Sequence, residues 1–421
     1  MLRLEGGRVL CPGTGVDALL DVVLDGDRVL GLFAAGTGPD APAVDCRGLV
    51  IAPAFVDLAC QLGDPGYPWR EDLHSGSRAA AAGGFATVVA TPATAPVIDR
   101  AAVADHVVRR GVEAPGARVL VSGALTVGLA GLELAELGGL ADAGCVAFAD
   151  GCRPVSDAGV LRRAFEYARP FGLPVIVRPG EPALEHEGVM HEGVVSLSVG
   201  LRGLPEAAEE VGVTRVVALA RATGARVHLS HVTTARAVAV LEGARREGLA
   251  VTAAVPARHL LLTDAEVAES GYDTRFRLMP PLRPARDRAA LIEAVRAGVI
   301  DVVAPDHVPL GRIDKELEFQ YAEPGAVGLE SAFAATLTAL EGDLALTVRR
   351  LSLAPAAVLG RTATIGVGAV ADLVVLDPNA VGPCAGPLYS KGCNEPLAGR
   401  SLRGRVVRTF VAGRDRSPAP R

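Results

Sequence analysis

The chain has 421 residues, half of them hydrophobic and only 4% aromatic, with a formal net charge of −6. This length suffices for one large α/β barrel and a smaller domain. The sequence has no basic patch with interleaved aromatic residues and no run of about 18 uncharged apolar residues, which argues against nucleic-acid binding and a membrane span. It shows no signal-peptide pattern at its start, and its seven Cys form no CxxC pair, so we expect a cytoplasmic protein with reduced thiols.

Both ends of the chain have the pattern of short strands. Residues 20–24 and 28–30 alternate apolar side chains around an Asp-Gly-Asp turn, which is typical of a β-hairpin. Residues 371–376 and 404–413 are strand-like and bounded by Gly. We therefore predict one small β-sandwich domain formed by residues 1–50 and 365–421.

The middle of the chain, residues 51–364, alternates short apolar strands with helical patterns. The predicted strands are 51–62, 86–90, 118–122, 145–149, 174–177, 226–230, 250–255 and 301–304. Helical patterns occupy 75–83, 156–171, 205–223, 234–247 and 286–297. About eight β-α units over this length predict a (β/α)8 TIM barrel.

Several sequence blocks, in order along the chain, resemble those of the dihydroorotases in the amidohydrolase superfamily. The blocks are 71–85 (EDLHSGSRAAAAGGF), 188–193 (GVMHEG), 203–209 (GLPEAAE), 314–319 (DKELEF), 324–330 (PGAVGLE) and 390–396 (SKGCNEP). The resemblance implies a barrel of amidohydrolase type. It also implies the reversible cyclisation of carbamoyl aspartate to dihydroorotate, with a metal-activated hydroxide and a carboxylate that moves protons.

The metal side of this pattern is incomplete. Where the family has His-x-His at the end of the first barrel strand, this chain has Ala59 and Gln61, which point the same way because they are two apart. Pro179 stands where the family has a further metal His, and Cys60 is expected to point outward and pack. The positions that survive are Asp150, His231, which matches the family's metal His, and Asp306, which matches the family's metal ligand and general base. They form either a remnant site for one weakly bound metal or a hydrogen-bonded polar cluster, the reading we favour.

The substrate side is also changed. The resemblance assigns substrate contacts to four positions that here hold Gly63 in place of a carboxylate-binding Arg, Ala93 in place of an Asn, Met279, and Leu310 in place of a His. Losing the guanidinium removes the strongest recognition element for a planar carboxylate.

The other polar residues of this region are expected to be structural. Arg178 is predicted to pair with a carboxylate or face solvent, and His228 to pack or cap. A surface or loop role is predicted for His74, His106, His186, His191 and His259, because none has metal-ligand spacing.

These observations favour a non-catalytic dihydroorotase homologue without cofactor. The resemblance extends to homologues that accompany bacterial aspartate carbamoyltransferase and hold it in a larger assembly, so we expect that enzyme as partner, and a homo-oligomer. The alternative is an active dihydroorotase or related cyclic amidohydrolase with a divergent zinc site. A third hypothesis is a small-molecule sensor that uses the emptied pocket.

Overall fold

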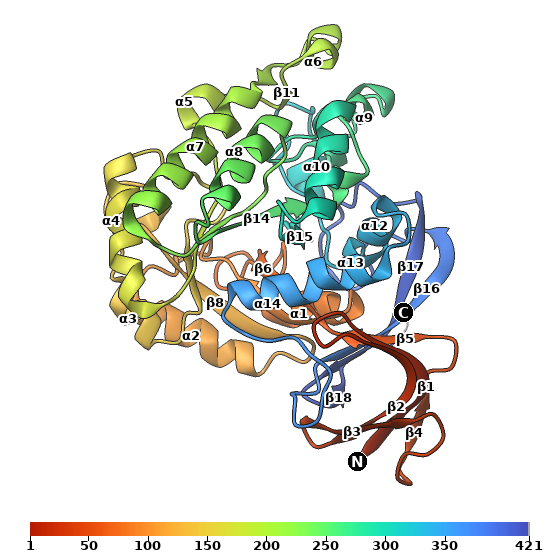
Figure 1. The fold of residues 1–421 in the computed structure, drawn as a ribbon. Helices are drawn as coiled ribbons and strands as arrows, with labels where there is room; N and C mark the ends of the chain where they lie inside the picture. Colours follow the sequence, from red (N-terminus) through yellow and green to blue (C-terminus); the bar gives the residue numbers. More distant parts are fainter. Residues whose placement is uncertain (420–421) are drawn as a thin grey trace.

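The structure, a computed structural model, describes residues 1–419 and confirms the predicted barrel (Figure 1). Its parallel eight-stranded sheet has the order β15-β14-β13-β10-β9-β8-β7-β6. The strands are β6 (Phe55–Cys60), β7 (Phe85–Ala90), β8 (Arg118–Ala124), β9 (Ala147–Ala149), β10 (Val175–Val177), β13 (Val227–Leu229), β14 (Val251–Pro256) and β15 (Val302–Ala304). At the seam between the first and last strands, the Gln61 amide donates to the His307 carbonyl oxygen at 3.1 Å.

Helices between the strands form the outer layer. The helices expected from the sequence are α1 (Leu73–Ala82), α4 (Ala158–Ala168), α7 (Glu206–Thr223), α8 (Ala235–Arg246) and α10 (Ala285–Ala297). The Asp72, Asp157 and Thr234 side chains cap α1, α4 and α8 by accepting backbone N–H bonds. Further helices around the barrel are α2 (Ala101–Val112), α3 (Leu137–Asp142), α9 (Ala265–Glu269), α11 (Arg312–Lys315), α12 (Ala332–Ala339), α13 (Leu344–Val348) and α14 (Ala354–Val358).

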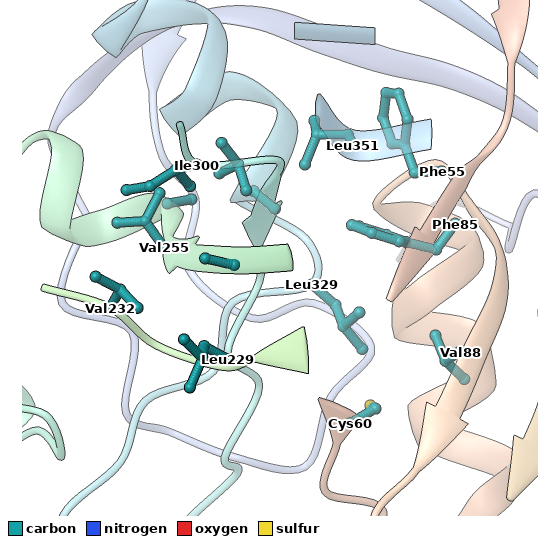
Figure 2. Packing of buried hydrophobic residues seen from close by; sticks show 14 of the residues in the cluster. Phe55, Cys60, Phe85, Val88, Leu229, Val232, Val255, Ile300, Leu329 and Leu351 are labelled. Carbon is teal, nitrogen blue, oxygen red and sulfur yellow. The ribbon is translucent and has the colours of Figure 1, made fainter. Parts of the chain in front are cut away.

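The barrel has two hydrophobic regions, one inside the strands and one between strands and helices. Inside, small and branched residues such as Leu58, Ala149, Ile176 and Ala254 fill the barrel. Outside, Phe55 and Phe85 meet with ring centroids 5.5 Å apart, in the same cluster as the buried Cys60 (Figure 2). Cys60 therefore packs outward, as expected.

The predicted strand 51–62 is two strands. β5 (Val50–Pro53) belongs to the terminal sheet, where it pairs with β16, and β6 starts the barrel after Ala54. The pairing of β6 with β7 also shifts register between Asp57 and Cys60. Such a bulge re-aims side chains near functional sites, and here it brings both Leu58 and Ala59 to the same cavity.

The terminal sheet is built from both ends of the chain, as predicted. Its order is β18-β17-β16-β5-β1-β2-β3, with β4 beside β1. The bounds are β1 (Leu2–Cys11), β2 (Val16–Asp25), β3 (Arg28–Ala34), β4 (Ala43–Asp45), β16 (Leu373–Pro383), β17 (Ser401–Val411) and β18 (Arg414–Asp415). The expected hairpin turn is present: Asp25 pairs with Arg28, and Gly26 has φ +57°. The sheet also takes in β5, whose residues 51–53 lie in the range predicted for the barrel.

The segment after β10 projects from the barrel before the chain enters α7 (Figure 1). It contains α5 (Pro182–Glu185), β11 (Met190–His191), α6 (Val194–Val199) and β12 (Gly203–Leu204). No helix within residues 1–419 is long and apolar enough to cross a membrane.

Candidate functional site

The surviving polar residues lie at the carboxyl ends of the barrel strands, where TIM barrels place their sites. His231 follows β13 and Asp306 follows β15. Both have left-handed backbone conformations, with φ +61° and +49°. Residues other than Gly adopt this region at an energetic cost, and such backbone strain clusters at functional sites. The strained backbone at His231 and Asp306 is therefore typical of a functional site.

His231 and Asp306 are brought together, and a third residue joins them. The His231 Nε2 lies 3.2 Å from Asp306 Oδ1, and Arg258 Nη1 lies 2.6 Å from Asp306 Oδ2. Arg258 also donates through Nη2 to the carbonyl oxygens of Pro305 and Asp306, at 2.8 and 2.9 Å. All three side chains are buried. A guanidinium thus neutralises the Asp306 carboxylate from within the protein.

His231 is held neutral. Burial lowers the pKa of its imidazole, and the nearby Arg258 guanidinium lowers it further, against the opposing effect of Asp306. Its Nδ1 has no hydrogen-bond partner within the part of the chain that the structure describes.

Asp150 does not join this pair. Its Oδ1 accepts from the Leu125 and Thr126 amides at 2.8 and 3.0 Å, and its Oδ2 accepts from Thr126 Oγ1 at 2.5 Å. Burial raises the pKa of the carboxyl, against these hydrogen bonds. Asp150 therefore fastens the segment after β8 to the end of β9.

The missing imidazoles are replaced by other contacts. Ala59 lines a cavity with Gln61, whose Nε2 donates to Cys152 Sγ at 3.0 Å. Burial raises the pKa of the Cys152 thiol to about 11, so the thiol stays protonated at neutral pH.

Arg178 closes the same region from the other side. It pairs bidentately with Glu185, with Nη–Oε distances of 2.8 and 2.6 Å, and donates from Nε to the Cys152 carbonyl oxygen at 2.7 Å. The expected carboxylate partner is therefore Glu185, carried by α5. Pro179 lies beside this ion pair.

The central cavity is nearly filled. The space bounded by Ala59, Gln61, Cys152, His231 and Asp306 has a volume of about 10 Å³, which is at most one water molecule. A drug-sized ligand needs about 300 Å³ or more. The mouth is closed to a substrate of that size.

The substrate positions are closed in different ways. Gly63 has φ +62°, and a Cβ added there would lie 2.7 Å from the carbonyl oxygens of Tyr67 and Glu71, so no side chain fits. Leu310 is buried, and its amide donates to Asn394 Oδ1 at 3.0 Å. Ala93 lies beside Gly151, and Met279 packs near Pro179.

The remaining histidines divide into exposed and buried ones. His74, His106 and His186 are exposed. The prediction of a surface or loop role is wrong for two others. His191 lies on β11 with its Nδ1 3.2 Å from Arg283 Nη1, and His259 is buried with its Nε2 3.2 Å from the Pro280 and Pro281 carbonyl oxygens. His228 packs against Thr252, with 2.9 Å between Nδ1 and Oγ1.

Sequence reasoning missed three members of this site. Arg258 lies in the short 3-10 helix Ala257–Leu260 after β14 and Cys152 in the turn after β9, and only the folded barrel reveals that they approach the site. Asp57 is buried in β6 and accepts the Ala59 amide at 3.2 Å, and burial raises the pKa of its carboxyl to about 6. For Asp57, the available signal in the sequence was a charged residue inside an otherwise apolar strand.

Comparisons with known proteins agree with this architecture. The family model described as "Dihydro-orotase-like" matches residues 48–237. The chain is 46% identical to a protein named dihydroorotase from Anaeromyxobacter dehalogenans, over 98% of this chain and 97% of that one. It is 41% identical to a protein of the same name from Pelobacter propionicus, over 98% of each chain. The chain belongs to the dihydroorotase family.

Solved structures show that this family member has the amidohydrolase-type fold. L-hydantoinase from Arthrobacter aurescens matches with a TM-score of 0.87 at 22% identity, covering 98% of this chain and 95% of that one. Dihydropyrimidinase from Brevibacillus agri matches with a TM-score of 0.83 at 20% identity, covering 98% and 94%.

The residues of this dihydroorotase-family chain do not fit the metal that the resemblance implies. Within residues 1–419, no group of three or more His, Cys, Asp or Glu side chains is placed to hold a metal ion. Asp150 is engaged elsewhere, and the Arg258 cation already pairs with Asp306. A dication at Asp306 would lie beside this guanidinium, which repels it.

Proposed function

We propose that this chain is a non-catalytic member of the dihydroorotase family that serves as a structural partner of aspartate carbamoyltransferase in pyrimidine biosynthesis. The observation that carries the proposal is the Arg258–Asp306 ion pair at the mouth of a barrel that has Ala59 in its first strand and Gln61 just after it at the ligand positions.

The family reaction needs a hydroxide made by a metal and a carboxylate free to take up a proton. Asp306 is the carboxylate at this place, and its oxygens are engaged by His231 and Arg258. Arg258 Nη1 lies 2.6 Å from Asp306 Oδ2, so this oxygen is already occupied by a partner within the protein. The central space of about 10 Å³ also leaves no room for a cyclic substrate.

The intact parts of the chain support a scaffold role. The tail 390–396 is bonded to both mouth loops: Ser390 Oγ donates to Glu71 Oε2 at 2.5 Å, and Asn394 Nδ2 donates to the Val308 carbonyl oxygen at 2.9 Å. These contacts keep the mouth rigid although its chemistry is lost. A rigid mouth that carries out no reaction suits a protein whose role is to present a binding surface to a partner.

Two measurements on the full chain test the proposal. We expect substoichiometric zinc after purification in zinc-containing buffer and no dihydroorotate turnover. We also expect a larger complex when the chain is mixed with aspartate carbamoyltransferase of the same organism and sized by sedimentation velocity. Stoichiometric zinc with turnover refutes the non-catalytic role, and a failure to form any complex refutes the scaffold role.

The second candidate is an active dihydroorotase or related cyclic amidohydrolase with a divergent metal site. The names of the relatives at 46% and 41% identity favour it. His231 and Asp306 would then hold the metal. Turnover that is lost on chelation and restored by zinc, and is absent in the Asp306→Asn variant, would establish it.

A further inference from the structure

Two loops at the barrel mouth expose large apolar side chains. Trp69, the only Trp of the chain, is 66% exposed in the loop 61–72 after β6, where Tyr67 lies beside it with ring centroids 5.7 Å apart. In the loop 305–331 after β15, which includes the short helix α11, the exposed apolar residues are Ile313 at 90%, Leu317 at 50% and Tyr321 at 68%. We call these five residues the loop patch.

An ion pair joins the two loops. Arg70 Nη2 lies 2.5 Å from Asp314 Oδ1, and these residues adjoin Trp69 and Ile313 in the sequence. The chain has one Trp and five Tyr in all, so gathering the Trp and two Tyr here is a concentration of the side chains that dominate protein interfaces. Exposed apolar side chains that gather in one place are typical of an interaction site.

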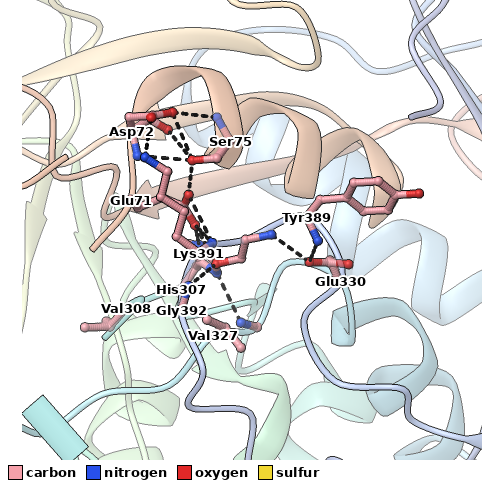
Figure 3. A network of polar contacts seen from close by, with 12 residues as sticks. Glu71, Asp72, Ser75, His307, Val308, Val327, Glu330, Tyr389, Lys391 and Gly392 are labelled. Atoms are coloured by element: carbon pink, nitrogen blue, oxygen red, sulfur yellow. Dashed lines mark hydrogen bonds and ion pairs between the residues drawn. The ribbon is translucent and has the colours of Figure 1, made fainter. Parts of the chain in front are cut away.

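The loop patch is also held rigid from beneath. Lys391 Nζ donates to the Pro68 carbonyl oxygen at 2.7 Å and to Asp72 Oδ2 at 2.5 Å, on the network around Glu71 (Figure 3). Lys315 is buried under the second loop, where its Nζ donates to the carbonyl oxygens of Thr274, Arg277 and Glu323 at 2.9, 3.2 and 2.7 Å. A surface already in place binds without the entropy cost of ordering loops.

The charges around the loop patch indicate what covers it. Glu316, Glu318 and Glu323 are exposed at its side. Arg312, 4.0 Å from Glu316, is the one cation in an ion pair with any of them within residues 1–419. In a two-fold contact with a second copy, these acidic groups would face each other, which is unfavourable. The rim therefore suits a different protein with basic residues around an apolar centre.

We propose that the loop patch is the docking surface for the transferase, through a transferase face with an apolar centre and a basic rim. This inference rests on the proposed function and adds the place of contact and the chemistry of the partner's face. An active barrel must leave its mouth open to substrate. In this chain the partner covers the mouth.

A matched pair of variants tests the docking surface. Ile313→Asp places a charge in the loop patch, and Val367→Asp does the same at a residue that is 78% exposed in the loop before β16. We expect wild type and Val367→Asp to bind the transferase equally. Loss of a central apolar contact costs about 2 kcal/mol or more, so Ile313→Asp should bind about 30-fold more weakly. Circular dichroism spectra should be the same for all three.

A second pair of measurements tests the basic rim. Reversing the charges in Glu316→Lys/Glu318→Lys should slow association with the transferase about 10-fold at low salt and remove most of the salt dependence of the rate. Trp69→Ala should instead raise the dissociation rate.

The outcomes separate this inference from the proposed function. If wild type binds the transferase and Ile313→Asp binds it equally well, the docking surface is wrong and the scaffold role stands. If Ile313→Asp changes only self-association of the chain, a second copy occupies the patch and the inference is overturned. If wild type forms no complex with the transferase, both fall.

Discussion

The Arg258–Asp306 pair gives the sharpest test of the reasoning about the mouth. In Arg258→Met, the buried Asp306 carboxylate loses its guanidinium partner. It keeps the His231 imidazole, whose Nε2 lies 3.2 Å from Asp306 Oδ1. Breaking a buried ion pair from one side costs about 3–5 kcal/mol. Such a loss is a large share of the roughly 5–15 kcal/mol by which a domain is usually stable.

The double variant Arg258→Met/Asp306→Leu should recover part of this loss. Replacing both charges by apolar groups is often neutral or stabilising. Here the Pro305 carbonyl oxygen loses its 2.8 Å bond from Arg258, so we expect a remaining cost of about 1–3 kcal/mol. The summed losses in free energy of unfolding of the two single variants should therefore exceed the loss in the double variant by about 2 kcal/mol or more.

The assay is unfolding in urea, followed by circular dichroism for wild type, both single variants and the double variant. Arg312→Met is the control, because Arg312 is 82% exposed along its side chain and such a surface charge contributes about 1 kcal/mol or less. A loss below about 1 kcal/mol in Arg258→Met, or strictly additive single variants, would refute the role given to the pair.

Three further predictions concern pH, the closed loop and the metal. Burial lowers the pKa of His228 and His259 to about 3. The free energy of unfolding should therefore be retained above pH 6.5 and fall below it, because the unfolded chain takes up protons that the folded chain excludes. The fall should be about 1.4 kcal/mol per pH unit for each histidine. Asp57, whose pKa burial raises to about 6, opposes part of this fall. Urea unfolding at several pH values measures this fall, and equal stability at pH 7 and pH 5 would contradict it. Gly63→Ala should destabilise the chain by about 1–3 kcal/mol, because the position has positive φ and close carbonyl oxygens, whereas Gly15→Ala, with open space around its Cβ, tests the φ effect alone. The double variant Ala59→His/Gln61→His should still bind less than one zinc per chain, as measured by metal analysis. Adding Arg258→Ala to it should raise the zinc content. An unchanged zinc content in this triple variant would show that Arg258 does not exclude the metal.

The fold was accessible from the sequence because each barrel strand is a short apolar run with its own turn signals. The predicted strand 118–122 and the observed β8 (Arg118–Ala124) differ by two residues at one end. The division of 51–62 into β5 and β6 was not accessible, because both are apolar and only the pairing of β5 with β16 separates them. Local pattern carries no information about which sheet a strand joins.

The site was partly accessible for a similar reason. The sequence places His231 and Asp306 at strand ends, and the structure brings them within 3.2 Å of each other. It gives no sign that Asp150 is bound by Thr126, or that Arg258 reaches Asp306 over 48 residues of sequence. Such partners depend on how loops cross the mouth, which strand and helix periodicity does not determine.

The tail that fastens the mouth loops also sets a time order for assembly. Ser390 bonds to Glu71, 319 residues earlier in the chain. At about 5–20 residues per second, a ribosome needs roughly 16–64 s to make that interval. The first mouth loop thus leaves the ribosome long before its fastening arrives, and a chain cut short before residue 390 has an unfinished mouth. Such a chain lacks the Ser390 and Asn394 hydrogen bonds that join the tail to the two mouth loops.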